Sequence, residues 1–177
     1  MGLIFSGTEV GSNRTLLAGQ GITHMGLNYW GLRKRGLPKT KIWLISEHFD
    51  SNTKVYIESG ASQADKAGLS KQELIDLAAD YQEFLVNNAD RAEAFLEFDS
   101  QILGKPWIEQ QRPFFSNDPK LWVIWHQEYG IQNLKELSEQ FQTVAIPNEE
   151  IESVTNLAGI TRAYERQYGT KDRKSVV

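Results

Sequence analysis

Short apolar segments that favour β-structure alternate with helical segments along this chain, most regularly in its second half. The predicted strands are residues 3–5, 22–29, 54–58, 92–99, 121–126 and 143–147. Several of these runs are almost continuously apolar, which is typical of strands that are covered on both faces in a parallel sheet. The sequence therefore predicts an α/β fold with about six parallel strands.

The helix that follows Ser70 has the strongest local signal. Ser70 and Glu73 form a capping box, in which the hydroxyl and the carboxylate satisfy free amides at the start of a helix. Apolar side chains then recur on one face as far as Asn87 and Asn88. Further helices are predicted around residues 134–141 and from Asn148 to about Tyr168.

Chain length helps to distinguish two α/β architectures, a (β/α)8 barrel and an open doubly wound sheet. A (β/α)8 barrel of the TIM type takes roughly 250 residues, whereas this chain has 177. We predict an incomplete barrel whose C-terminal units are missing, with residues 1–171 as the N-terminal part of one barrel domain. An open doubly wound sheet fits the length better and remains the alternative.

The last six residues, 172–177 (DRKSVV), differ in character from the rest of the chain. One reading frame of the sequencing-adapter sequence GATCGGAAGAGCGTCGTG encodes these residues, and its continuation TAG is a stop codon. We therefore expect residues 172–177 to be a non-native tail, translated from adapter sequence that follows the natural coding sequence at the end of a sequencing read. An ordinary polar tail is the alternative.

Several classes of protein are excluded by composition. The chain has no cysteine, which removes disulfide scaffolds, thiol nucleophiles, iron–sulfur clusters and cysteine-type zinc sites. No apolar run reaches the ~18–20 residues of a membrane helix, and the first residues do not form a signal peptide. We expect a cytoplasmic protein with no membrane partner.

Positive charge is concentrated in one segment of an acidic chain. The net charge is −4, from 19 basic and 23 acidic residues, and residues 31–41 hold five of the basic residues and no acid. The rest of the chain therefore carries 14 basic against 23 acidic groups, a net charge of −9. Such a basic loop could bind the backbone of a nucleic acid, or it could be an ordinary solvated loop. Its basic residues are Arg33, Lys34, Arg35, Lys39 and Lys41.

Titratable residues follow three of the predicted strands. Glu58 ends one strand, Asp99 ends the next with Glu97 two residues before it, and His126 ends a third. In parallel α/β sheets the functional groups lie at the carboxyl ends of the strands, so these residues predict an acid/base or base-recognition site. Gly60, together with Ala61, leaves room for a ligand to approach the backbone.

Each of these residues also has an ordinary structural interpretation. Glu58 and Asp99 could be helix caps or ion-pair partners, and His126 could be a hydrogen-bonded histidine of the core. Glu97 could pair with a basic group such as Arg91 or Arg112. The three histidines are too scattered to predict a metal site, and phosphate-loop, dinucleotide, zinc-helix and nucleophile-elbow motifs are lacking, so no cofactor is predicted.

Two of the strand ends resemble motifs of one enzyme family. Residues 58–63 (ESGASQ) resemble the DSGGFQ motif of tRNA-guanine transglycosylases, and residues 98–100 (FDS) resemble the FDE motif that holds the purine. The run SGTEVGSNRTLLAGQGITHMGLNYWGLRKRGLPKT, with EFDSQILGKPW and LWVIWHQEYG, is similar to the phage branch of this superfamily. That branch, the deoxypurine-in-DNA transglycosylases, inserts 7-deazaguanines into DNA. The resemblance extends over most of residues 3–170.

The resemblance implies a role for each strand end. Glu58 matches the motif aspartate with an acid/base and substrate-orienting role, and Asp99 matches the aspartate that binds the Watson–Crick edge of the base. Ser59, Gly60 and His126 would line the base pocket. Three departures affect this match: Glu58 is one methylene longer than aspartate, Ala61 replaces a glycine and Ser62 replaces an aromatic residue.

The implied activity is the exchange of guanine for a 7-deazaguanine in nucleic acid, DNA first and tRNA as the alternative, through a covalent glycosyl-enzyme. The nucleophilic aspartate of the family, and the zinc site of its tRNA-acting members, lie on later strands that have no match here. We therefore expect this fragment to be inactive, and its oligomeric state is left open, with a homodimer as one candidate. Two other hypotheses remain: a glycoside hydrolase-like barrel that uses Glu58 with Glu97 or Asp99, and a non-enzymatic nucleic-acid-binding phage protein.

Overall fold

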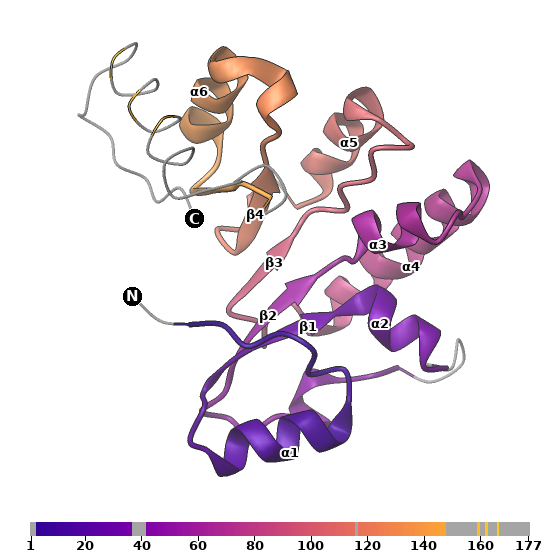
Figure 1. The fold of residues 1–177 in the computed structure, drawn as a ribbon, viewed down its shortest axis with the longest axis vertical. Coiled ribbons are helices and arrows are strands. Elements are labelled where there is room, and N and C mark those ends of the chain that lie inside the picture. The colour runs from indigo at the N-terminus through magenta and orange to yellow at the C-terminus, as the bar shows by residue number, and fades with distance from the viewer. Residues whose placement is uncertain are drawn as a thin grey trace. The chain divides into compact units, whose positions relative to one another are not determined.

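The computed structural model describes residues 3–36, 42–115 and 117–147, together with positions 159, 162 and 166. The chain divides into two compact units, Met1–Phe114 and Phe115–Val177, and each is described by itself. Both units combine parallel strands with helices, as Figure 1 shows. The predicted α/β class with parallel strands is confirmed.

Three parallel strands form the centre of the first unit. They are β1 (His24–Asn28), β2 (Lys54–Glu58) and β3 (Ala94–Leu96). The register places Asn28 beside Glu58 at the ends of β1 and β2, and Ile57 beside Phe95 where β2 pairs with β3. Because the strands are parallel, their carboxyl ends lie at the same edge of the sheet.

The predicted first strand, residues 3–5, is wrong in its extent. Among these residues only Phe5 pairs with the sheet, through an isolated parallel bridge to Met25. The Phe5 amide donates to the His24 carbonyl at 3.1 Å, and the Gly26 amide donates to the Phe5 carbonyl at 2.8 Å. Leu3 is 77% exposed, so its apolar side chain is not covered as a buried strand requires.

Helices and short 3-10 turns connect the strands of the first unit. They are α1 (Gly11–Gly19), α2 (Tyr29–Lys34), η1 (Ile45–Glu47), α3 (Ala61–Lys66), α4 (Lys71–Asn88), α5 (Lys105–Gln111) and η2 (Arg112–Phe114). Helix α1 buries none of its residues, which explains why apolar periodicity does not predict it. Helix α2 covers part of the segment that the sequence predicts as a basic loop, so that prediction is corrected for residues 31–34.

Helix α4 begins where its capping box predicts. The Glu73 amide donates to Ser70 Oγ at 3.3 Å, and the Ser70 amide donates to Glu73 Oε2 at 2.8 Å. One face of the helix is buried, including Leu74, Leu77 and Tyr81. The predicted bounds and buried face of this helix are therefore confirmed.

The second unit contains two parallel strands joined by a helix. They are β4 (Leu121–Ile124) and β5 (Thr143–Ala145), with η3 (Gln127–Tyr129) and α6 (Gly130–Gln140) between them. Val123 lies beside Val144 in this pair. The predicted helix from Asn148 falls largely outside the described residues.

The observed strands are shorter than the predicted apolar runs. The run 92–99 is a strand only over Ala94–Leu96, and the run 121–126 only over Leu121–Ile124. The described residues therefore hold five strands and one bridge, where the sequence predicts about six strands. The apolar runs of the sequence extend past the ends of β3 and β4 because residues after these strands, such as Phe98 and Trp125, are also buried in the core.

Candidate functional site

The carboxyl edge of β1 and β2 brings a serine, an asparagine and a glutamate close to one another. Ser6 Oγ donates to Glu58 Oε1 at 3.3 Å, across the end of β1. Gly26 permits this approach, because a Cβ there would lie 2.8 Å from Ser6 Oγ. Asn28, beside Glu58 in the register, accepts from the Gly31 amide at 2.8 Å and so caps α2. Glu58 is half-buried.

The segment after Glu58 is shaped by packing against the chain itself. Gly60 has a φ of +74° and precedes α3, and a Cβ at this position would lie 2.5 Å from both Asn28 Oδ1 and Trp30 Cβ. The Ala61 amide donates to Ser59 Oγ at 3.3 Å, and the Trp30 amide donates to the Ser59 carbonyl at 3.2 Å. On the side where a Cβ would lie, Asn28 and Trp30 therefore fill the space beside Gly60, and the approach of a ligand to this backbone from another side stays a prediction.

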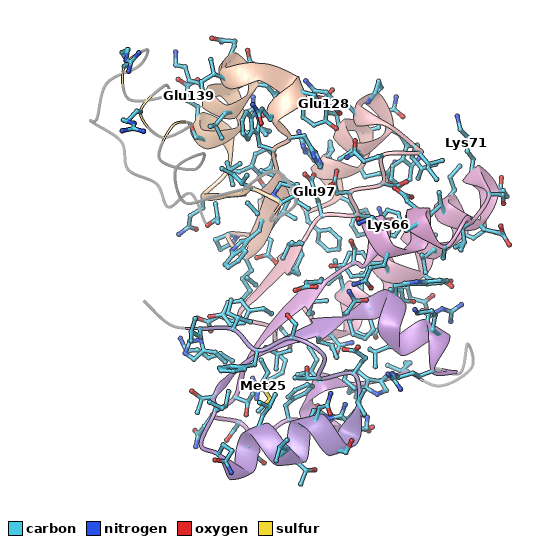
Figure 2. The ribbon with its side chains drawn as sticks, viewed as in Figure 1. Met25, Lys66, Lys71, Glu97, Glu128 and Glu139 are labelled. Atoms are coloured by element: carbon cyan, nitrogen blue, oxygen red, sulfur yellow. The ribbon has the colours of Figure 1, made fainter. Side chains whose placement is uncertain are left out.

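Asp99 lies in a buried segment that directly follows β3. Asp99 is 8% exposed, and Gln101 Nε2 donates to its Oδ1 at 3.4 Å. Asp99 and Glu97 both lie beyond Leu96, the last residue of β3, so strand periodicity does not set their directions. Figure 2 shows Glu97 on the stretch of chain between β3 and α5.

Glu97 forms a buried, bidentate ion pair with Arg112. Arg112 Nε donates to Glu97 Oε2 at 2.7 Å, and Arg112 Nη2 donates to Glu97 Oε1 at 3.0 Å. Burial lowers the pKa of Arg112, but the hydrogen bond and charge of Glu97, with the charges of Glu109 and Asp99, leave this pKa raised overall. Of the two partners that the sequence offers for Glu97, the structure selects Arg112.

Tyr81 on α4 interacts with the ends of both β2 and β3. Its hydroxyl donates to the Leu96 carbonyl at 2.7 Å, and its ring lies 6.2 Å from the Phe98 ring. Burial, and secondarily the charge of Glu58, raise the pKa of Tyr81 well above its usual range. The raised pKa favours the protonated hydroxyl, which donates to the backbone at Leu96, three residues before Asp99.

The basic segment is only partly available for a ligand. Arg33 Nη2 forms an ion pair with Asp80 Oδ2 at 2.8 Å, and Lys34 Nζ lies 5.9 Å from the centre of the Trp30 ring. Arg35 is exposed. Lys39 and Lys41 lie outside the described residues.

His126 belongs to the second unit, in which it is buried two residues beyond β4. Its ring makes an edge-on contact with Tyr129 at 5.2 Å, and its carbonyl accepts from the Tyr129 amide at 2.9 Å. Its neighbour Trp125 donates from Nε1 to the Gly130 carbonyl at 3.0 Å. Glu58, Ser59, Gly60 and Asp99 all belong to the first unit.

Some residues at this edge are not singled out by the sequence. Asn28 could have been found by applying the strand-end rule to β1, which it ends. Tyr81 follows the apolar pattern of α4 and reads as core, and Asp65 on α3 has no motif of its own. Only contacts across the fold assign Tyr81 and Asp65 to the site: Tyr81 donates to the Leu96 carbonyl, and Asp65 accepts from Ser100 and Gln101.

Within the described residues, no group of three or more histidines, aspartates or glutamates could hold a metal ion. No helix in this part of the chain is both long and apolar enough to cross a bilayer. Comparisons with models of protein families, with curated proteins and with solved structures find no match to this chain. Two carboxylates, Glu58 and Asp99, are the titratable groups of this edge, and an ionised carboxylate accepts hydrogen bonds.

Proposed function

We propose that the first unit binds a guanine-type base at the carboxyl edge of β2 and β3. It would serve as the base-recognition part of a transglycosylase that exchanges guanine for a 7-deazaguanine in nucleic acid, DNA in the first place. One observation carries this proposal: Glu58 ends β2, and Asp99 follows β3, its parallel neighbour, by three residues. The strand order β1-β2-β3, without reversal, supports an incomplete (β/α)8 barrel.

Asp99 suits a guanine because of the hydrogen-bonding pattern of that base. The Watson–Crick edge of guanine presents two adjacent donors, the ring N1–H and the exocyclic amino group. A carboxylate only accepts and has two oxygens, so it can take both hydrogen bonds at once. Adenine presents an acceptor at its ring N1 and cannot make this pair of contacts.

Glu58 suits proton transfer at the same edge. It is half-buried and hydrogen-bonded to Ser6, and a carboxylate positioned in this way can exchange a proton with a bound base. In base exchange, a carboxylate forms a bond to the anomeric carbon as the bond to guanine N9 breaks, and the departing base takes up a proton. The incoming base then loses its N9 proton and displaces the carboxylate. We assign the nucleophile to no residue of this chain, and we expect base binding without exchange.

The direct test is equilibrium dialysis of the whole chain with radiolabelled guanine and with 7-deazaguanine. We expect Asp99→Asn to weaken guanine binding by about tenfold or more, because charge-assisted hydrogen bonds are lost and an amide donor faces a donor. Asp76→Asn is the matched control, since Asp76 is exposed on α4. Equal guanine affinity in the wild type and in Asp99→Asn, with the fold intact by circular dichroism, would contradict the proposal.

The proposal also requires contact with nucleic acid, because a base within a duplex must leave the stack to enter a pocket. Arg35, which is exposed, would contact a phosphate, whereas Arg33 is already paired with Asp80. We expect Arg35→Ala to weaken DNA binding and to reduce the slope of log K against log salt by about one. An unchanged slope would remove Arg35 from the interface.

A further inference from the structure

Asp65 on α3 joins the two segments that carry the motif residues. Its Oδ1 accepts from Ser100 Oγ at 2.7 Å, and its Oδ2 accepts from the Gln101 amide at 2.8 Å. Ser100 and Gln101 directly follow Asp99, and Ser100 is fully buried. Helix α3 itself starts at Ala61, within the segment that begins at Glu58. One carboxylate thus ties the end of β2 to the segment after β3.

The same segment is held on its other side by Arg112, which binds both oxygens of Glu97. Asp99 therefore lies between two anchored points, Glu97 before it and Ser100 after it. Ser100 Oγ also accepts from the Leu103 amide at 3.2 Å, which closes the turn that follows. A backbone fixed on both sides leaves the Asp99 carboxylate few orientations, as a preorganised binding group requires.

We propose that Asp65 is a positioning residue that sets the orientation of Asp99 toward a guanine-type base. The inference rests on the proposed function and deepens it, because it names the residue that positions the selective carboxylate of Asp99. Without Asp65, Ser100 and the Gln101 amide lose a charged partner and the segment relaxes. Asp99 then no longer meets the two donors of guanine together, whereas adenine, which does not make this pair of contacts, is affected less.

The test compares guanine with adenine in the whole chain by equilibrium dialysis. We expect Asp65→Ala to weaken guanine binding by about tenfold or more while adenine binding changes much less, so that the preference for guanine falls. Ser100→Ala removes one of the two contacts of Asp65, together with the acceptor of the Leu103 amide, and should weaken guanine binding in the same direction. If Asp65→Ala does not fold, the guanine and adenine affinities of Ser100→Ala still test the proposal. Asp76→Asn again serves as the exposed control.

A double-mutant cycle separates positioning from simple stabilisation. If Asp65 acts through Asp99, Asp65→Ala should cost little further guanine affinity once Asp99→Asn is present. Equal losses for guanine and adenine, or additive losses in the double variant, would overturn the positioning role. A wild-type chain that binds no purine would overturn the proposed function and this inference with it. A wild-type chain that prefers guanine, with Asp65→Ala and Ser100→Ala binding as the wild type does, would overturn the inference alone.

Discussion

Replacing Gly60 by alanine tests whether this glycine serves the packing of the site edge. Gly60 has a φ of +74°, where a residue with a Cβ is strained by about 1–2 kcal/mol. The added Cβ would also lie 2.5 Å from Asn28 Oδ1 and 2.5 Å from Trp30 Cβ. Neither neighbour can withdraw freely, because Asn28 caps α2 and the Trp30 amide is bonded to the Ser59 carbonyl.

The size of the effect follows from these two contributions. Forcing a methyl group into a filled space costs about 1–3 kcal/mol, which includes weakening of the Asn28 cap. Added to the backbone strain, this predicts that Gly60→Ala lowers the free energy of unfolding by about 2–5 kcal/mol. Gly68 provides the matched control: its φ is +78°, and a Cβ at this position would have no neighbouring atom within 4 Å. Gly68→Ala should therefore show the strain alone, about 1–2 kcal/mol.

Urea denaturation followed by tryptophan fluorescence measures both variants, with the free energy extrapolated linearly to water. Gly60→Ala should be less stable than Gly68→Ala by at least about 1 kcal/mol. If the two variants unfold within about 0.5 kcal/mol of each other, the contacts with Asn28 and Trp30 do not explain this glycine.

Three further predictions concern stability. Arg112→Met should lower the free energy of unfolding by about 3–5 kcal/mol because Glu97 is left buried without its partner, and the double variant with Glu97→Gln should recover part of this loss in the same urea assay. Ser70→Ala removes the cap of α4 and should cost about 1 kcal/mol, seen as a lower thermal midpoint by circular dichroism. Since the folded-state pKa of Tyr81 is raised, the unfolded chain releases this proton first, and stability should fall above pH 10 by about 1.4 kcal/mol per pH unit for this group. Tyr81→Phe should make that fall shallower, and an unchanged pH dependence would contradict the buried, protonated hydroxyl.

Local sequence signals predict much of the secondary structure. The strand at residues 54–58 and the capping box of α4 appear as predicted, because β-propensity with a turn and a cap with an apolar face are local properties. The same reasoning overextends the runs 3–5 and 92–99, since apolar side chains are also needed where the chain leaves a strand and enters the core. Helix α1 is missed because it buries no residue.

The sequence by itself determined the α/β class and the strand that ends at Glu58, whereas Asp99 lies three residues beyond the end of β3. Alternation of apolar strands with helices, and the rule that parallel strands end at one edge, are enough for that. Only the tertiary structure decided that Glu97 pairs with Arg112, that Asp65 holds Ser100 and Gln101, and that Asn28 and Trp30 fill the space at Gly60. These contacts join residues from different elements, and no periodicity or motif encodes which of several carboxylates will meet which donor once the helices pack.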